Sequence, residues 1–372
     1  MRTLVVSDLH LGTRSGADVL RREVALERLI AALHGVTRLV LLGDVLELRQ
    51  SPMREAMAAA EPVMRAFGAA LGPQGEVVIV PGNHDHRLLA PWFEDRGRDA
   101  PPAPLQLEER PGPSVSPALT KLAQWLKPAT TDVAYPGLWL RDGVYATHGH
   151  YLDRHTTLPT FERIGAGIMG RLVGALPERA TPDDYEAALA PLYAWMDTIA
   201  ERAPAQRAPT RGSVGVWRLL TGDGHRPLRG RILLGFLPIG ISTLNALGLG
   251  PVKADLSPRE VWSAGVRAMA GAVERMQIEA DHVIFGHTHR SGPLAQDDSL
   301  EWTFTGGGRL INSGCWVYEP AFLSRGRSSP FWPGAAVALD DDGGPPRVIR
   351  LLGDVDPDAL RAPEPETEPP LE

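Results

Sequence analysis

The chain has 372 residues, of which 43% are hydrophobic, and this length suits one large domain or one domain with an insertion. Its formal net charge of −7 provides no global field toward nucleic acid or anionic lipid, so we expect no nucleic-acid partner. Cys315 is the only cysteine, which excludes an intrachain disulfide and is typical of a reducing compartment.

Five apolar runs along the chain each end in a cluster of Asp, His or Asn. Short β-branched runs predict buried strands, and sites in α/β sheets form where loops leave the carboxyl ends of the strands. Oxygen and imidazole groups that meet at one such edge are typical of a polynuclear metal site. The clusters are Asp8-Leu9-His10, Gly43-Asp44, Gly82-Asn83-His84-Asp85, His148-Gly149-His150 and Gly286-His287-Thr288-His289.

The N-terminal quarter of the chain predicts repeated strand–helix units. Residues 18–34 have apolar side chains at helical spacing. Residues 51–71 predict a second helix with Ser51 as its N-cap, and Pro62 should kink or split it. Residues 97–118 are rich in proline and predict a loop. The chain begins directly with a strand and shows no signal peptide, so we expect a cytoplasmic protein.

The segment between the fourth and fifth clusters is long and partly apolar. Residues 232–250 form a run of 19 residues without a charge, which just reaches the length of a membrane span. A single span would place His148 and His287 on opposite sides of the membrane. The run is therefore either a buried helical cap or an interfacial, lipid-facing lid. An earlier stretch of the segment predicts an amphipathic helix with one apolar face, formed by Phe161, Ile164, Ile168, Met169, Leu172, Val173 and Leu176.

After the fifth cluster, residues 310–314, 335–339 and 348–352 predict strands of a second sheet. The tail, residues 362–372, is rich in Pro and Glu and predicts disorder.

The five clusters together, in this order, resemble the calcineurin-like metallophosphoesterase superfamily. The resemblance covers residues 1–95, 140–150 and 280–315. It implies a four-layer α/β/β/α sandwich, with a core of residues 1–150 and 281–355 and a mainly helical cap insertion at 151–280.

The resemblance also implies a set of metal ligands and an activity. Two divalent or trivalent cations, roughly 3.5–4 Å apart, would activate a hydroxide that attacks the phosphate. The ligand types suit Mn or Fe, and Zn also fits. Asp44 would bridge the two cations. Asp8, His10 and His289 would complete the first metal's shell, and Asn83, His148 and His287 the second.

Other residues near the clusters are expected to act on the substrate. His84 would donate a proton to the leaving group, and Asp85 would orient its imidazole and raise its pKa. Glu47 could support the site or serve structure alone. Four arginines follow ligand clusters and could bind substrate phosphate, although a salt bridge is the better interpretation of each: Arg14, Arg87, Arg154 and Arg290. His86, His150 and His155 also lie near the clusters; for His150 we expect a supporting contact rather than ligation.

The sequence leaves the substrate, the metal and the oligomeric state open. The apolar insertion favours a lipid-linked phosphate or pyrophosphate, with peripheral membrane contact. The opening Asp-Leu-His-Leu-Gly is similar to that of UDP-diacylglucosamine hydrolase, but that family usually has Arg at the position of His84 and Asp at the position of His150. A soluble phosphodiesterase or phosphatase acting on a nucleotide or other small polar phosphate is the alternative. A non-catalytic scaffold with this fold is the third interpretation.

Overall fold

The structure, a computed structural model, describes residues 2–98, 102–156, 176–202, 258–323 and 326–362. The apolar face at 161–175, the run at 232–250 and the tail from residue 363 lie outside these ranges. Within the described residues, no helix is long and apolar enough to cross a membrane.

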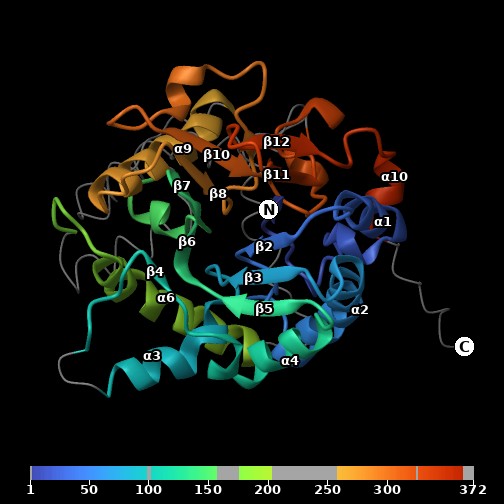
Figure 1. Cartoon of the computed structure of the whole chain (residues 1–372), viewed down its shortest axis with the longest axis horizontal. Coiled ribbons are helices and arrows are strands. Elements are labelled where there is room, and N and C mark those ends of the chain that lie inside the picture. Colours follow the sequence, from blue (N-terminus) through green and yellow to red (C-terminus); the bar gives the residue numbers. More distant parts are fainter. Residues whose placement is uncertain (1, 99–101, 157–175, 203–257, 324–325, 363–372) are drawn as a thin grey trace, which may run out of the picture.

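Two six-stranded sheets form the centre of the molecule (Figure 1). The first has the order β12-β11-β1-β2-β3-β5, in which β1, β2, β3 and β5 are parallel and β11 and β12 are antiparallel to their neighbours. Its strands are β1 (Thr3–Val6), β2 (Arg38–Leu42), β3 (Glu76–Val80), β5 (Thr130–Val133), β11 (Ala335–Leu339) and β12 (Arg347–Arg350).

The second sheet has the order β4-β6-β7-β8-β10-β9. Its inner strands β7, β8 and β10 are parallel, and β4, β6 and β9 pair antiparallel at the two sides. Its strands are β4 (Glu108–Glu109), β6 (Tyr135–Arg141), β7 (Val144–Thr147), β8 (His282–Phe285), β9 (Ser291–Gly292) and β10 (Arg309–Ser313).

Alternating side chains on the strands build the layers. In β3, Val77 and Ile79 face the helices that cover the first sheet, whereas Val78 and Val80 face the second sheet. Because successive side chains of a strand point to opposite faces, one strand contributes to two separate cores. The alternation confirms the four-layer α/β/β/α architecture.

Helices cover the outer face of each sheet (Figure 1). α1 (Glu23–Ala32), α2 (Met53–Leu71) and α4 (Pro117–Trp125) pack on the first sheet. α9 (Pro258–Arg275) packs on the second through Val266, Met269 and Val273. The remaining helices are η1 (Val19–Arg21), η2 (His86–Leu89), α3 (Ala90–Arg96), η3 (Pro113–Val115), η4 (His150–Arg154), α6 (Pro182–Arg202), η5 (Ser299–Trp302), η6 (Pro320–Phe322), η7 (Gly326–Ser328) and α10 (Pro357–Leu360).

The prediction that the last two strands belong to a second sheet is wrong. β11 pairs antiparallel with β1, in the register Thr3↔Leu339, and β12 pairs with β11, so both extend the first sheet. Strand pairing between residues more than 300 positions apart depends on the tertiary fold, which a local apolar pattern does not encode. Only β10 of the predicted set joins the second sheet. The division of the chain into core, cap and tail stays a prediction, and α9 supplies an outer layer of the core sandwich.

Three local predictions also need correction. Residues 18–34 form η1 and α1, separated by Arg22 in an extended conformation. α2 runs unbroken through Pro62, whose side chain is exposed, and Ser51 donates a hydrogen bond to the Gly12 carbonyl (2.7 Å) instead of capping the helix. The predicted loop at 97–118 contains β4, η3 and the start of α4.

Candidate metal centre

The ends of parallel strands bring the predicted ligands together. β1, β2 and β3 are parallel in one sheet, and β7 and β8 are parallel in the other. Ligand candidates follow the carboxyl end of each of these strands, which is where sites of α/β sheets form. Asp8 and His10 follow β1, Asp44 follows β2, Asn83 follows β3, His148 follows β7, and His287 and His289 follow β8.

The backbone is bent at these positions. Among the described residues, the non-glycine positions with a positive φ are Asp8, His10, Asp44, His287, His289 and Gln277. The left-handed region is unfavourable for residues with a Cβ and persists where the surrounding structure enforces it, commonly at functional sites. Five of the six are ligand candidates, so the backbone strain is concentrated in the segments that aim these side chains.

Glycines let the ligand segments pack against one another. A Cβ on Gly43 would lie 2.1 Å from His148 Nδ1, and one on Gly82 would lie 2.4 Å from Asp44 Oδ1. A Cβ on Gly286 would lie 2.5 Å from Asp8 Oδ2. These distances are shorter than any van der Waals contact, so each glycine is required by a ligand side chain from another strand.

The first cluster consists of Asp8, His10 and His289. His10 Nε2 and His289 Nε2 lie 3.1 Å apart, and His289 Nε2 lies 3.3 Å from Asp8 Oδ1. Asp8 Oδ2 accepts hydrogen bonds from the Ser7 hydroxyl and the His287 amide, whereas the buried Asp8 Oδ1 has no hydrogen-bond partner among the described residues. A buried carboxylate oxygen that faces two imidazoles fits a cation ligand.

The second cluster consists of Asn83, His148 and His287. His148 Nε2 lies 3.1 Å from Asn83 Oδ1, while His148 Nδ1 donates to the Leu42 carbonyl at 3.0 Å. His287 Nε2 contacts Asp153 Oδ1 at 2.9 Å, which leaves His287 Nδ1 on the Asn83 side, 3.0 Å from the amide. Each imidazole is therefore fixed by a contact at one ring nitrogen, and its other ring nitrogen faces Asn83. Metal-binding histidines are commonly held in this way.

Asp44 lies between the two clusters. Its Oδ2 is 3.2 Å from His148 Nε2, 3.7 Å from His10 Nε2 and 4.0 Å from His84 Nε2. Two groups of potential metal-binding side chains share this carboxylate, one with His10 and His84 and the other with His148 and His287. The geometry fits a bridging ligand, because one oxygen is within reach of both clusters.

His84 is oriented by Glu47, not by Asp85 as the sequence suggested. Its Nδ1 lies 2.9 Å from both oxygens of Glu47, and the same carboxylate lies 3.0 Å from His10 Nδ1. Asp85 instead accepts hydrogen bonds from the backbone amides of Gly82 (2.6 Å) and Val45 (2.7 Å). Asp85 ties together the loops after β2 and β3, and Glu47 connects His84 to the first cluster.

The pKa of His84 also departs from the expectation. Burial lowers the pKa of His84, and Glu47 offsets this only in part. Burial and the nearby Asp44 carboxylate raise the pKa of Asp85 to about 6. The imidazole therefore favours its neutral form in the metal-free chain.

The other charged groups of the centre stabilise one another. Burial opposes a charge on His148, but Asp44 raises its pKa to about 9. Burial also opposes a charge on His289, but Cys315 and Asp8 raise its pKa to about 10. Burial favours a neutral Asp44, yet His148 and its neighbours hold the pKa of Asp44 well below its usual value. In the metal-free chain, protons therefore hold the positive charge that a cation would supply.

The arginines predicted to bind substrate are dispersed. Arg290 is buried, pairs with Asp297 at 2.6 Å and stacks over Trp302, which is a structural role. Arg14 lines a separate hollow of about 1060 Å³ between η1 and α2. Arg87 and Arg154 are part-buried on η2 and η4. The three additional histidines contact other elements: His86 Nε2 lies 3.0 Å from Glu186, His150 Nε2 lies 3.3 Å from the Tyr135 hydroxyl, and His155 Nε2 lies 2.6 Å from the Tyr185 hydroxyl.

Three residues of the site were missed by sequence reasoning. Asp153 holds His287, Glu186 of α6 reaches His86, and Arg49 lies against Asn83. Arg49 follows Glu47 by two positions, and this is the one local signal that could have found it. Asp153 and Glu186 lie in the segment between His148 and His287, where no motif points to them.

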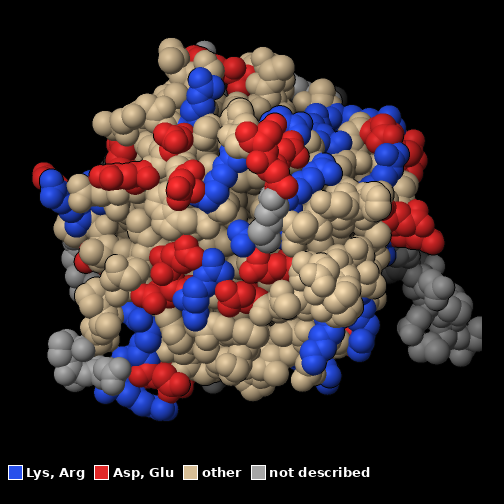
Figure 2. Space-filling view, in the orientation of Figure 1, with Lys and Arg blue, Asp and Glu red and all other residues tan. Residues whose placement is uncertain are grey.

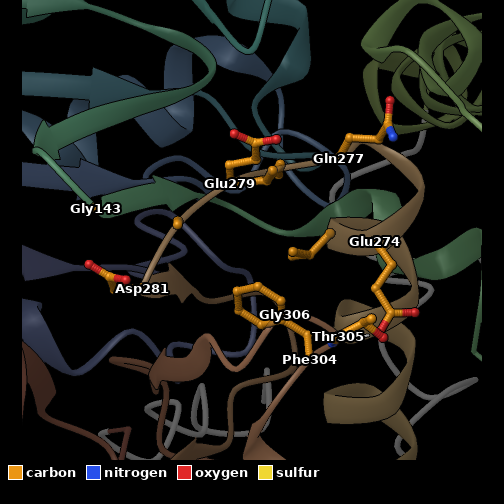
Figure 3. Close-up of a pocket in the computed structure, with 11 residues that line it drawn as sticks. Gly143, Glu274, Gln277, Glu279, Asp281, Phe304, Thr305 and Gly306 are labelled. Carbon is orange, nitrogen blue, oxygen red and sulfur yellow. Dashed lines mark hydrogen bonds between the residues drawn. The ribbon is translucent and has the colours of Figure 1, made fainter.

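A cavity of about 650 Å³ lies elsewhere, where α9 ends and β8 begins (Figure 3). Figure 3 shows the carboxylates of Glu274, Glu279 and Asp281 around it, with the ring of Phe304. None of its described lining residues is a histidine. The cavity adjoins the amino end of β8, whereas His287 and His289 follow its carboxyl end, so it is not part of the centre.

Comparisons with known proteins agree with this site. Residues 1–193 match the family model of calcineurin-like phosphoesterases, and the chain belongs to that family. It is a metal-dependent phosphoesterase, a hydrolase of phosphoric esters. The matched range includes Asp8 to His148, while His287 and His289 lie beyond it and are joined to the site by the fold.

Other comparisons add little. A solved dimetal phosphatase from Danio rerio is 14% identical, with 94% of this chain and 99% of that chain covered and a TM-score of 0.33. No curated protein matches the chain. The partial resemblance to UDP-diacylglucosamine hydrolase stays a prediction.

Proposed function

We propose that the two clusters and Asp44 hold two cations, and that this centre hydrolyses a phosphate ester or pyrophosphate. The observation that carries the proposal is the Asp44 carboxylate, whose Oδ2 is 3.2 Å from His148 Nε2 and 3.7 Å from His10 Nε2. Asp8, His10 and His289 would hold one cation, and Asn83, His148 and His287 the other. Carboxylate, amide and imidazole donors suit Mn or Fe, with Zn as the alternative.

The chain's own residues would divide the remaining work. Two cations would acidify a water and neutralise phosphate charge. His84 would give a proton to the leaving group from Nε2. Because Nδ1 carries the proton that is donated to Glu47 at 2.9 Å, Nε2 has a proton only when the imidazole is charged, so His84 would act in its imidazolium form. Its side chain is 20% exposed, which gives it access to a substrate. Asp85 would hold the loop that carries Asn83 and His84, through the backbone amides of Gly82 and Val45.

The proposed substrate is a lipid-linked phosphate, bound with the help of the segment between His148 and His287. The uncharged run at 232–250 supports this choice, and so does Trp195 of α6, which is 54% exposed. Peripheral contact with the inner face of a membrane would follow. On the face in Figure 2, acidic and basic side chains are interspersed, which supports the expectation that nucleic acid is not a partner. The alternative is a soluble phosphodiesterase or phosphatase that has a polar pocket and acts on a nucleotide or other small polar phosphate.

The test begins with protein stripped of metal and refilled with Mn²⁺, assayed on bis-p-nitrophenyl phosphate and p-nitrophenyl phosphate. Metal-dependent hydrolysis of either ester would support the centre, and the ratio of the two rates would distinguish a diesterase from a monoesterase. Sedimentation with phospholipid vesicles would then separate the substrate classes. Vesicle binding together with hydrolysis of a lipid phosphate supports the lipid-linked proposal. Efficient hydrolysis of nucleotides with no vesicle binding would replace it with the soluble alternative.

A further inference from the structure

A buried carboxylate joins α6 to the segments that hold the second cluster. Glu186 of α6 is 7% exposed, and its Oε2 lies 3.0 Å from His86 Nε2. Its Oε1 accepts hydrogen bonds from the Tyr151 hydroxyl, at 2.6 Å, and from the Tyr135 hydroxyl. Burial favours a neutral Glu186, but His86 and the two hydroxyls hold the pKa of this carboxyl below its usual value. The carboxylate is therefore charged, and groups from three other segments satisfy it.

One arm of this contact reaches the loop after β3. His86 comes three residues after Asn83 and two after His84, at the start of η2. Its ring stacks on Phe93 of α3, with the centroids 5.1 Å apart and an angle of 15° between the planes. The imidazole is thus fixed on one face by α3 and at Nε2 by Glu186. Because only one residue separates His86 from His84, a shift of this ring would move the loop that carries Asn83.

The other arm reaches η4. Tyr151 lies two residues before Asp153, whose Oδ1 is 2.9 Å from His287 Nε2. The ring of Tyr151 also stacks on Tyr185 of α6, with the centroids 4.7 Å apart and an angle of 11° between the planes. The Tyr185 hydroxyl lies 2.6 Å from Nε2 of His155, the residue that follows η4. α6 therefore contacts η4 on both sides of Asp153.

The two arms end on two supports of the second cluster. Asn83 is itself a ligand candidate, and Asp153 holds the imidazole of another, His287. We propose that Glu186 is a positioning residue of the second cluster, which aligns Asn83 and His287 for their cation through the β3 loop and η4. This inference rests on the proposed function. It gives α6, which lies between His148 and His287 in the sequence, a part in metal binding in addition to any contact with the substrate.

Stepwise calorimetric titration of the metal-stripped full chain with Mn²⁺ tests the proposal without requiring turnover. Glu186→Ala should weaken binding of the cation of the second cluster by about tenfold, the lower end of the effect of groups that hold a metal ligand from outside, because Glu186 acts through other residues. Binding of the first cation should be nearly unchanged, because Asp8 and His10 follow β1, which neither arm reaches. Glu186→Gln should keep most of the affinity, because its amide can still accept from a hydroxyl and donate to His86.

The matched control is Asp183→Ala on the same helix. Asp183 Oδ2 accepts a hydrogen bond from the Leu105 amide at 2.7 Å, and Leu105 belongs to neither the β3 loop nor η4. Removing this contact loosens α6 without touching either arm, so both cation affinities should stay at the wild-type values.

Coupling between α6 and the second cluster must be reciprocal, so the cation should also stabilise the helix. Hydrogen exchange measures this effect. The amides of α6 should exchange more slowly when the second equivalent of Mn²⁺ binds to the wild type, and Glu186→Ala should lose this slowing. A role of Glu186 in packing alone would lower the melting temperature of the variant and leave the metal-dependent slowing in place.

Affinity of Glu186→Ala for the second cation within about twofold of the wild type would overturn the proposal. Equal weakening in Asp183→Ala would contradict it too, since any loosening of α6 would then suffice. If Glu186→Ala does not fold, Tyr151→Phe replaces it by removing one hydroxyl, and unchanged affinity there would be equally contrary. A wild-type chain with a Glu186-dependent second cation but no esterase activity would support the inference and contradict only the proposed hydrolysis. A wild-type chain that binds one cation would contradict both.

Discussion

The two clusters use similar ligands but differ in charge and exposure. The first has two carboxylates close to its imidazoles, Asp8 as a ligand candidate and Glu47 on His10, and its His289 side chain is 32% exposed. The second has one such carboxylate, Asp153 on His287, and a neutral amide, Asn83, with Arg49 beside it, and its His148 side chain is fully buried. The comparison indicates that the first cluster should bind its cation more tightly, while the second keeps positive charge available for a phosphate.

Removing the residue that the clusters share should have the largest effect. Asp44→Ala should lose dinuclear binding and reduce hydrolysis by roughly 10³-fold or more, because the cations supply several kcal/mol of charge stabilisation. Metal analysis and esterase assays of the refilled variant measure this. Asp354→Ala is the matched control, since this carboxylate is 68% exposed. Full activity with two cations in Asp44→Ala would show that the clusters are independent.

The next largest effect should come from the proton donor. His84→Ala should retain both cations and slow turnover by roughly 10²- to 10⁴-fold. Two measurements check this prediction: the turnover rate at saturating substrate, and the metal content of the variant. Asp85→Ala should act differently: it leaves buried backbone amides without an acceptor, at roughly 1–3 kcal/mol each, and should lower the melting temperature. Normal turnover in His84→Ala would remove His84 from the mechanism.

The contrast between the clusters can be sharpened through their supporting carboxylates. Glu47→Gln should weaken the cation of the first cluster by roughly 10- to 100-fold, and Asp153→Asn that of the second by a similar factor. Each carboxylate contacts the imidazole nitrogen that would not bind the cation, at 3.0 Å for His10 Nδ1 and 2.9 Å for His287 Nε2. Stepwise Mn²⁺ titration of both variants would resolve the two affinities. Equal loss at both steps in both variants would contradict separate supports.

Metal binding should also depend on pH. With pKa values raised to about 9 for His148 and about 10 for His289, both imidazoles are protonated at neutral pH without metal. Cation binding must release these protons, so affinity should rise with pH by about tenfold per pH unit for each proton released, up to about pH 9 for His148 and about pH 10 for His289. In the metal-free chain the sign for stability is opposite: the raised pKa values stabilise the fold below about pH 6.5, and this contribution is lost as pH rises through 9 to 10. Calorimetry in buffers of different ionisation enthalpy would count the protons, and no proton release would contradict the assignment.

Sequence patterns predicted the strand ends of the site because each is local: an apolar run followed at once by Asp, His or Asn. They also predicted that Asp8, Asp44 and His148 would meet. They failed where the partner is distant in sequence. β11 pairs with β1 across the whole chain, and Glu47 lies against His84, while Asp85, the adjacent carboxylate, binds backbone amides instead. Glu186 reaches His86 from 100 residues away, and such contacts are determined by tertiary packing.

The left-handed backbone at Asp8, Asp44 and His287 also could not be predicted from the sequence. These residue types have no propensity that requires a positive φ, so the strain becomes visible only when the sheets fix both sides of each turn. The sequence shows the glycines beside these residues, but it does not show which side chains require a glycine there. Gly43 and Gly82 are required by His148 and Asp44, which come from other strands.

The central claim is that Asp44 joins the two clusters into one dinuclear centre. Electron paramagnetic resonance of the Mn²⁺-loaded wild-type chain, combined with metal analysis, tests it most directly. Two manganese ions per chain with an exchange-coupled spectrum is the predicted result. One ion per chain, or two ions with the spectrum of isolated Mn²⁺, would contradict the claim.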